Sequence, residues 1–149
     1  MAHFAKISEE NKVLSVHVVH DNDTSRDGVE LEDAGQSNLQ KIHSWPTNLW
    51  IKCSYNTYQG THRKGGTPFR GNYPSVGWDW DLTNEIFIPE KPYPSWTLNI
   101  AEARWQSPIG DAPALSEEEA MISLYGWNEA TQAWDLINTG TTLLQQNNS

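Results

Sequence analysis

The chain has 149 residues, one cysteine and a net charge of −9, and these facts exclude several classes of protein. The length fits one domain that buries a core without covalent staples, while the lone Cys53 excludes an internal disulfide framework and a four-cysteine zinc site. The 19 acidic residues against 10 basic ones argue against a nucleic-acid binder, because such proteins gain affinity by neutralising phosphates.

The N-terminal residues predict a β-hairpin. MAHFAKISEENK has no long apolar run, so we expect no signal peptide or transmembrane segment. Residues 3–19 contain two runs of β-branched and aromatic residues separated by a polar turn. In the second strand, alternation places Val13, Ser15, His17 and Val19 on one face, and the predicted core set Leu14, Val16 and Val18 on the other.

The next residues predict a loop, a helix and a strand. Residues 20–30 are a predicted loop. Residues 30–43 carry apolar residues at nearly helical spacing, which predicts one short helix that Gly35 interrupts or weakens and that ends before Trp45-Pro46. Residues 49–55 predict a strand in which Cys53 is buried and chemically inert.

Residues 56–76 predict a long loop. Loops of this length inside a compact domain are typically functional or held by a partner. The stretch HRKGGTPFR contains three of the ten basic residues. A solvated loop is favoured over a phosphate site, and in assemblies such a loop often meets an acidic neighbour. The candidate interface residues are Tyr58, Arg63, Lys64, Phe69, Arg70 and Tyr73.

Three further hairpins are predicted over 77–90, 94–108 and 125–137. Each has an aromatic residue, a polar turn and a second large apolar residue. An isolated hairpin is marginally stable, and an aromatic pair across its strands adds about 0.5–1.5 kcal/mol. Residues 116–119 predict a helix start, and residues 139–149 a polar tail. The fold class is therefore mainly β: Trp-clamped hairpins and small antiparallel sheets with one or two short helices. They form one small domain, 1–149, in which 95–138 can be a C-terminal hairpin sub-module.

Trp127 and Trp134 have two interpretations. They clasp a hairpin shut, which is the favoured one, or they form a flat aromatic platform for a ligand such as a sugar. The two interpretations predict different exposure of the indole rings, and exposure cannot be derived from the sequence.

Catalytic and metal-binding patterns are weak. His17 and His20 point to opposite faces of a strand, so they do not form a metal pair. Asp79 and Asp81 share a face and can bind a cation or act as paired carboxylates. The favoured interpretation is a polar strand face opposite inward-pointing Trp78, Trp80 and Leu82. We therefore predict no catalytic residue, metal or cofactor.

The order of several motifs resembles small proteins encoded by tailed phages of marine bacteria, especially cyanobacteria. These motifs are MAHFAKI followed by VLSVHVVHD, then WIKCSYNT, a basic Gly-rich loop, YPSVGWDWD, FIPEKPYPSW and YGWNEATQAW. The resemblance covers roughly residues 2–137 and implies a virion or virion-associated component, not an enzyme. Residues 108–124 look longer than in that group.

The resulting hypothesis is a virion structural protein, made in the host cytoplasm, that acts as a capsid decoration or cement protein. Its expected partners are the major capsid protein or tail proteins, and not nucleic acid or membrane. One alternative is a tail-fibre or baseplate accessory protein that contacts host glycans. Another is a small hydrolase or metal-dependent enzyme that uses Asp79, Asp81 and a histidine. Whether the chain forms a homo-oligomer stays open.

Overall fold

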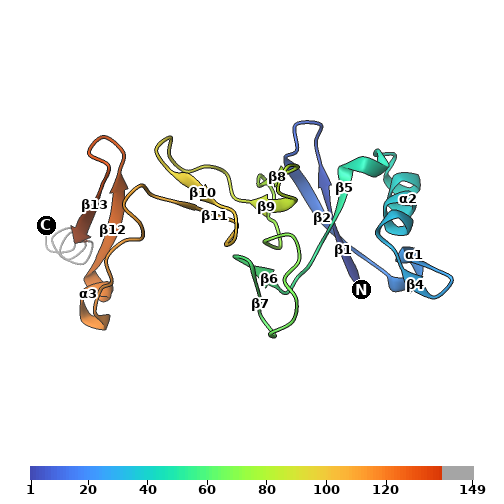
Figure 1. Ribbon diagram of the computed structural model, residues 1–149, viewed down its shortest axis with the longest axis horizontal. Coiled ribbons are helices and arrows are strands. Elements are labelled where there is room, and N and C mark those ends of the chain that lie inside the picture. The colour runs from blue at the N-terminus through green and yellow to red at the C-terminus, as the bar shows by residue number, and fades with distance from the viewer. Residues whose placement is uncertain (139–149) are drawn as a thin grey trace, which may run out of the picture. The chain divides into compact units, whose positions relative to one another are not determined.

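The computed structural model describes residues 1–138 and is mainly β with short helices, as predicted (Figure 1). Residues 1–91 and 98–105 form one compact unit, called unit 1 here. Residues 92–97 and those from 106 onward form a second, called unit 2. The sub-module predicted over 95–138 overlaps unit 2 and also includes residues of unit 1. The predicted tail lies outside the described residues.

A three-stranded antiparallel sheet is the centre of unit 1. It consists of β1 (Ala2–Ile7), β2 (Val13–Val19) and β5 (Trp50–Cys53) in the order β2-β1-β5, and β5 follows the 3₁₀ turn η1 (Thr47–Leu49). The strands predicted within 3–19 and 49–55 are confirmed.

One face of this sheet packs against α2 (Glu32–His43). Phe4 and Trp50 are completely buried there, and Leu39 of the helix covers them. The helix is continuous through Gly35, whereas the sequence predicts a helix that is weakened or broken there. A Cβ atom at this position would lie 2.5 Å from Cζ of Phe4. The glycine therefore allows the helix to approach the sheet closely.

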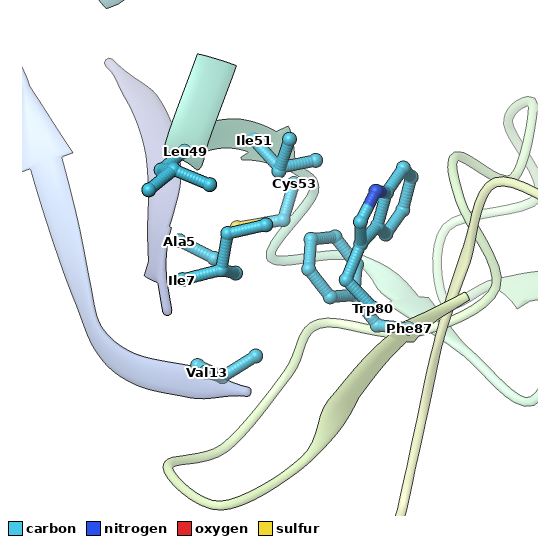
Figure 2. Close-up of a cluster of buried hydrophobic side chains, with 8 residues drawn as sticks. All are labelled: Ala5, Ile7, Val13, Leu49, Ile51, Cys53, Trp80 and Phe87. Atoms are coloured by element: carbon cyan, nitrogen blue, oxygen red, sulfur yellow. The ribbon is translucent and has the colours of Figure 1, made fainter. Parts of the chain in front are cut away.

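The other face packs against a second hairpin, formed by β8 (Asp79–Asp81) and β9 (Ile86–Ile88). Trp80 and Phe87 of this hairpin lie against side chains of the sheet, as Figure 2 shows. The members of this cluster are Ala5, Ile7, Val13, Leu49, Ile51, Cys53, Trp80 and Phe87. Leu82 was predicted to point inward with Trp80, which is wrong, because it lies in the hairpin turn and is 70% exposed.

The predicted core face of β2 is also wrong. Leu14 and Val18 are exposed, and Val16 alone of that set packs against the core. The buried residues of the strand are Val13 and Val19, which belong to different clusters.

The cause is an irregularity in the pairing of β1 with β2. Lys6 pairs with Ser15, but the next residue, Ile7, pairs with Val13. Leu14 is therefore an extra residue, as in a β-bulge, and it interrupts the regular alternation of faces. In addition, both faces of the sheet are covered, so each buries some side chains of the strand.

The segment from 20 to 30, predicted as a loop, contains regular structure. It forms the one-turn helix α1 (Asp21–Thr24) and a two-residue hairpin of β3 (Ser25–Arg26) and β4 (Val29–Glu30). These elements are too short to produce a periodic pattern of apolar residues.

The long loop from 56 to 76 is held by contacts within unit 1. It begins with a small hairpin of β6 (Thr57–Tyr58) and β7 (Thr61–His62). Asn72 is buried, and its Nδ2 donates to the carbonyls of Phe87 and Ala103, each at 2.8 Å. Its Oδ1 accepts from the Gln59 amide at 2.8 Å. Unit 1 itself therefore fixes the path of this loop.

The predicted hairpin within 94–108 is present as β10 (Thr97–Asn99) and β11 (Arg104–Gln106). In unit 2, the predicted helix start is confirmed by α3 (Glu117–Ile122). Its N-cap Ser116 and Glu119 form a reciprocal capping box. The predicted closing hairpin is β12 (Ser123–Asn128) and β13 (Ala133–Asn138). No helix within 1–138 is long and apolar enough to cross a membrane.

Candidate binding surfaces

The six predicted interface residues divide into two groups. Tyr58, Arg63 and Lys64 are exposed on or beside the β6–β7 hairpin, and the Tyr58 side chain is 61% exposed. The Arg63 guanidinium lies 5.0 Å from the ring centroid of Tyr55, which is also exposed. We call the exposed side chains of Tyr55, Tyr58, Arg63 and Lys64, which lie on or beside this hairpin, the basic loop patch.

The other group is packed into unit 1. The guanidinium of Arg70 bonds the carboxylate of Glu32 and the carbonyl of Lys52, and it lies 4.6 Å from the ring centroid of Phe69. The guanidinium is also 5.4 Å from the Trp80 ring. Arg70 and Phe69 thus join the loop to the sheet, which the sequence did not indicate.

Tyr73 belongs to a second internal cluster. Its hydroxyl lies 3.1 Å from Nδ1 of His3, and its ring meets the His3 and Tyr55 rings edge-on. Burial, with a smaller contribution from Cys53 and Tyr55, raises the pKa of Tyr73. Burial, with a smaller contribution from the N-terminal ammonium, lowers the pKa of His3. Both shifts favour the neutral forms in this contact.

A pocket of about 390 Å³ lies beside this cluster and is lined by Lys52, Glu30, Tyr55 and Phe69 among others. Lys52 Nζ and a carboxylate oxygen of Glu30 form an ion pair at 2.8 Å. The two charged side chains of the lining therefore interact with each other.

Trp127 and Trp134 face each other across the β12–β13 hairpin. They are direct cross-strand partners, their ring centroids are 5.2 Å apart, and their planes make an angle of 71°. Trp96 packs edge-on against both rings, at 5.7 and 5.9 Å. Because the three indoles meet edge to face, they do not present one flat surface, and this geometry favours the clasp over the platform.

Hydrogen bonds fix the same cluster in place. Glu129 accepts from the Ser95 amide at 3.0 Å, from the Ser95 hydroxyl at 2.7 Å and from the Trp127 indole N–H at 2.7 Å. The Trp134 indole donates to the Gly110 carbonyl at 3.0 Å, whereas the buried indole nitrogen of Trp96 has no hydrogen-bond partner among residues 1–138. Sequence reasoning missed Ser95 and Glu129, since they are 34 residues apart and form no motif.

The carboxylates considered for chemistry have structural partners. Asp79 pairs with Lys12 Nζ at 3.0 Å. Asp81 accepts from the Thr83 and Asn84 amides and from the Asn84 side chain. Burial acts to raise the pKa of Asp81, but these hydrogen bonds outweigh it and lower the pKa. Both side chains thus stabilise the hairpin and its junction with residue 12.

The remaining candidates are separated from one another. Cys53 is buried, and burial is the main reason that the pKa of its thiol is raised to about 12. His17 lies against the rings of Trp50 and His43, while His20 caps the first turn of α1. Within residues 1–138, no three histidine, cysteine or acidic side chains come together as a metal site.

Comparisons with protein-family models, curated proteins and solved structures find no match to this chain.

Proposed function

We propose that this chain is a virion structural protein, most specifically a capsid decoration or cement protein, that works through protein–protein contacts and without catalysis. One observation carries the proposal. Within the described part of unit 2, no hydrophobic side chain is buried, and several large apolar side chains of α3 and of the β12–β13 hairpin are open to solvent. The exposed ones are Met121, Ile122, Leu124, Leu136 and Ile137.

Exposed apolar side chains gathered in one part of a protein are typical of interaction sites. The β12–β13 hairpin is two-stranded, and hairpins of this size are marginal without further packing. The indole clasp and the Glu129 hydrogen bonds supply part of that packing. A partner that covers the exposed apolar side chains supplies more, which suits a protein that is most stable when attached to an assembled particle.

Residues considered for other functions also support a structural role. Asp79 and Asp81 form local bonds, and the indoles of Trp127 and Trp134 pack against each other and against Trp96. These contacts favour a non-enzymatic role and give no support to a flat sugar-binding platform. The phage resemblance supplies the virion context.

Immunogold electron microscopy on virions of the encoding phage tests the proposal, with antibody raised against the full chain. We expect label over the whole head. Label confined to the tail would contradict decoration and favour the tail-accessory alternative. If mass spectrometry does not find the chain in purified particles, the virion assignment fails. Re-binding of purified chain to particles that have lost it measures the attachment directly.

A further inference from the structure

Charge is strongly segregated along the chain. Unit 2, counted over 92–97 and 106–149, contains six acidic residues and no lysine, arginine or histidine. The acidic residues are Asp111, Glu117, Glu118, Glu119, Glu129 and Asp135. In contrast, residues 34–78 contain five lysines and arginines and no acidic residue. Each part of the chain therefore has the charge that the other lacks.

The acidic side chains at α3 lie beside exposed apolar ones. Glu117, Glu118 and Glu119 form the exposed first turn of α3, and Met121 at its other end is 81% exposed. Exposed Ile122 and Leu124 follow directly along the chain. We call residues 117–124 the acidic apolar patch.

The basic loop patch has the complementary composition. Tyr55 and Tyr58 are both more than half exposed. The Arg63 guanidinium lies over the Tyr55 ring, and the exposed Lys64 follows Arg63 in sequence. Tyrosine and arginine are the side chains enriched at the centres of protein interfaces. This patch offers aromatic surface and positive charge where the other offers aliphatic surface and negative charge.

We propose that the acidic apolar patch of one copy binds the basic loop patch of a second copy, so that the chain self-associates head to tail. Contact between two acidic apolar patches brings like charges together, as does contact between two basic loop patches, and both are disfavoured. When the acidic apolar patch of one copy binds the basic loop patch of another, the pair still has one free patch of each kind. Such heterologous contacts generate closed rings or open filaments.

This inference deepens the proposed function and rests on it in one respect, namely that unit 2 is a protein-binding surface. The proposed function names virion proteins as the partner, whereas this inference adds a second copy of the chain, which binds before the particle does. Particle attachment then uses surfaces that the copy–copy contact leaves free. Sedimentation of the purified chain tests the inference, whereas labelling of virions tests the proposed function, so either can fail alone.

The first measurement is sedimentation velocity on the full purified chain over a range of concentrations. At low salt we expect concentration-dependent growth beyond the monomer. In about 0.5 M NaCl we expect association to weaken by roughly tenfold or more, because salt screens exposed charges. A monomer at every concentration at low salt would overturn the proposal, and so would association that salt does not weaken.

Charge-reversal variants test which surfaces meet. Variant R63E/K64E makes the basic loop patch acidic, and variant E117K/E118K makes the acidic apolar patch basic while leaving the Ser116–Glu119 capping box intact. Each variant alone carries patches of like charge and should stay monomeric. An equimolar mixture should associate again. If either variant alone associates like the parent chain, or if the mixture stays monomeric, the head-to-tail contact is wrong.

Matched single substitutions control for the change in net charge. Lys41 is exposed at the C-terminal end of α2, outside the basic loop patch. K64E should weaken association by about tenfold or more, since it reverses a charge within the contact, while K41E should change it by less than about threefold. Equal effects would mean that net charge alone controls association, which would overturn the proposed contact. Circular dichroism confirms that each variant is folded.

Discussion

The guanidinium of Arg70 and the carboxylate of Glu32 are joined by two parallel hydrogen bonds, of 2.6 and 2.9 Å. The same groups also bond the backbone of Lys52, whose amide donates to Glu32 and whose carbonyl accepts from Arg70. Lys52 lies on β5, which is an edge strand of the sheet. The ion pair therefore satisfies polar groups of that edge and ties the 56–76 loop to α2.

Breaking this pair should destabilise unit 1. Because the side chains are largely buried and bidentate, we expect R70A to lower the free energy of unfolding by about 2–3 kcal/mol. Urea unfolding followed by hydrogen exchange at the β1 and β5 amides measures the loss. The control is R26A, which removes an exposed pair with Asp33 on the same helix and should cost less than about 0.5 kcal/mol. Equal losses would contradict the structural role given to Arg70.

Gly35→Ala should also destabilise unit 1, although alanine is the better helix former. Helix propensity alone favours alanine by about 1 kcal/mol. At this position the new Cβ atom would lie 2.5 Å from the Phe4 ring, which cannot move freely in the core. Overpacking of this kind costs about 1–3 kcal/mol. We expect a lower thermal midpoint for G35A and little change for Q40A, at an exposed site of the same helix. A stabilised G35A would show that the helix shifts at little cost.

Local patterns were sufficient to predict most strands and hairpins. The alternation in 3–19 and 49–55, the turns at 83–84 and 129–132, and the Ser116 cap depend on residues close together in sequence. Features that depend on tertiary packing were missed. The apolar pattern does not predict the bulge at Leu14. Glycine is a poor helix former, so the sequence predicts a weakened helix at Gly35, and only the tertiary contact with Phe4 explains why glycine is needed there.

The candidate site was predicted in part for the same reason. Trp127 and Trp134 are close in sequence and pair through one turn, so their partnership was foreseen. Arg70 was assigned to an interface because it lies in a basic Gly-rich loop, and its partner Glu32 is 38 residues away in sequence, beyond the reach of any local pattern. Glu129 went unnoticed because an acidic residue in a polar turn has no distinguishing context. Its role follows from the distant Ser95, which only the folded chain brings near.

Replacing the buried Asn72 should destabilise the 56–76 segment. N72A leaves the Gln59 amide and the carbonyls of Phe87 and Ala103 without their partner in a buried site. Each unsatisfied group costs about 1–3 kcal/mol, so we expect a loss of at least about 2 kcal/mol. Denaturant unfolding of N72A against N48A, at an exposed asparagine, provides the comparison. A loss below 1 kcal/mol would mean that water replaces the amide or that the loop adjusts.

The stability of unit 1 should fall as the solution becomes acidic. His17 packs against Trp50 and His43, and burial, followed by the charges of His43 and Lys6, lowers its pKa below the ordinary 6.5. The unfolded chain then binds protons at a higher pH than the folded one, so stability rises with pH in this range. The contribution of neutral His17 to the stability of unit 1 should be fully present above pH 6.5, and it should be lost as the pH falls below that value.

The variant H17Q should reduce this pH dependence without abolishing it, since the pKa of His3 is lowered as well. Urea midpoints measured between pH 5 and 8 give the slope for each chain. A parent chain whose stability rises on acidification through pH 6.5 would contradict the sign, and an unchanged slope in H17Q would mean that His17 is not responsible.

Unit 2 should depend on the Glu129 carboxylate. The variant E129Q keeps the size of the side chain but places an N–H₂ group where one carboxylate oxygen accepted a hydrogen bond. Because the carboxylate accepts from both groups of Ser95 and from the indole of Trp127, at least one donor loses its partner and the remaining bonds lose their charge assistance. We expect the free energy of unfolding of unit 2 to fall by about 1.5–3 kcal/mol.

Near-ultraviolet circular dichroism reports on this change, since the edge-to-face indoles of Trp96, Trp127 and Trp134 give a signal only while they are held together. Its thermal midpoint should fall in E129Q. E118Q changes an exposed glutamate on α3 and should leave the midpoint within about 1 °C, because surface substitutions away from such contacts have small effects. If E129Q and E118Q behave alike, the indole cluster holds residues 93–96 to the hairpin without Glu129, and aromatic packing alone closes unit 2.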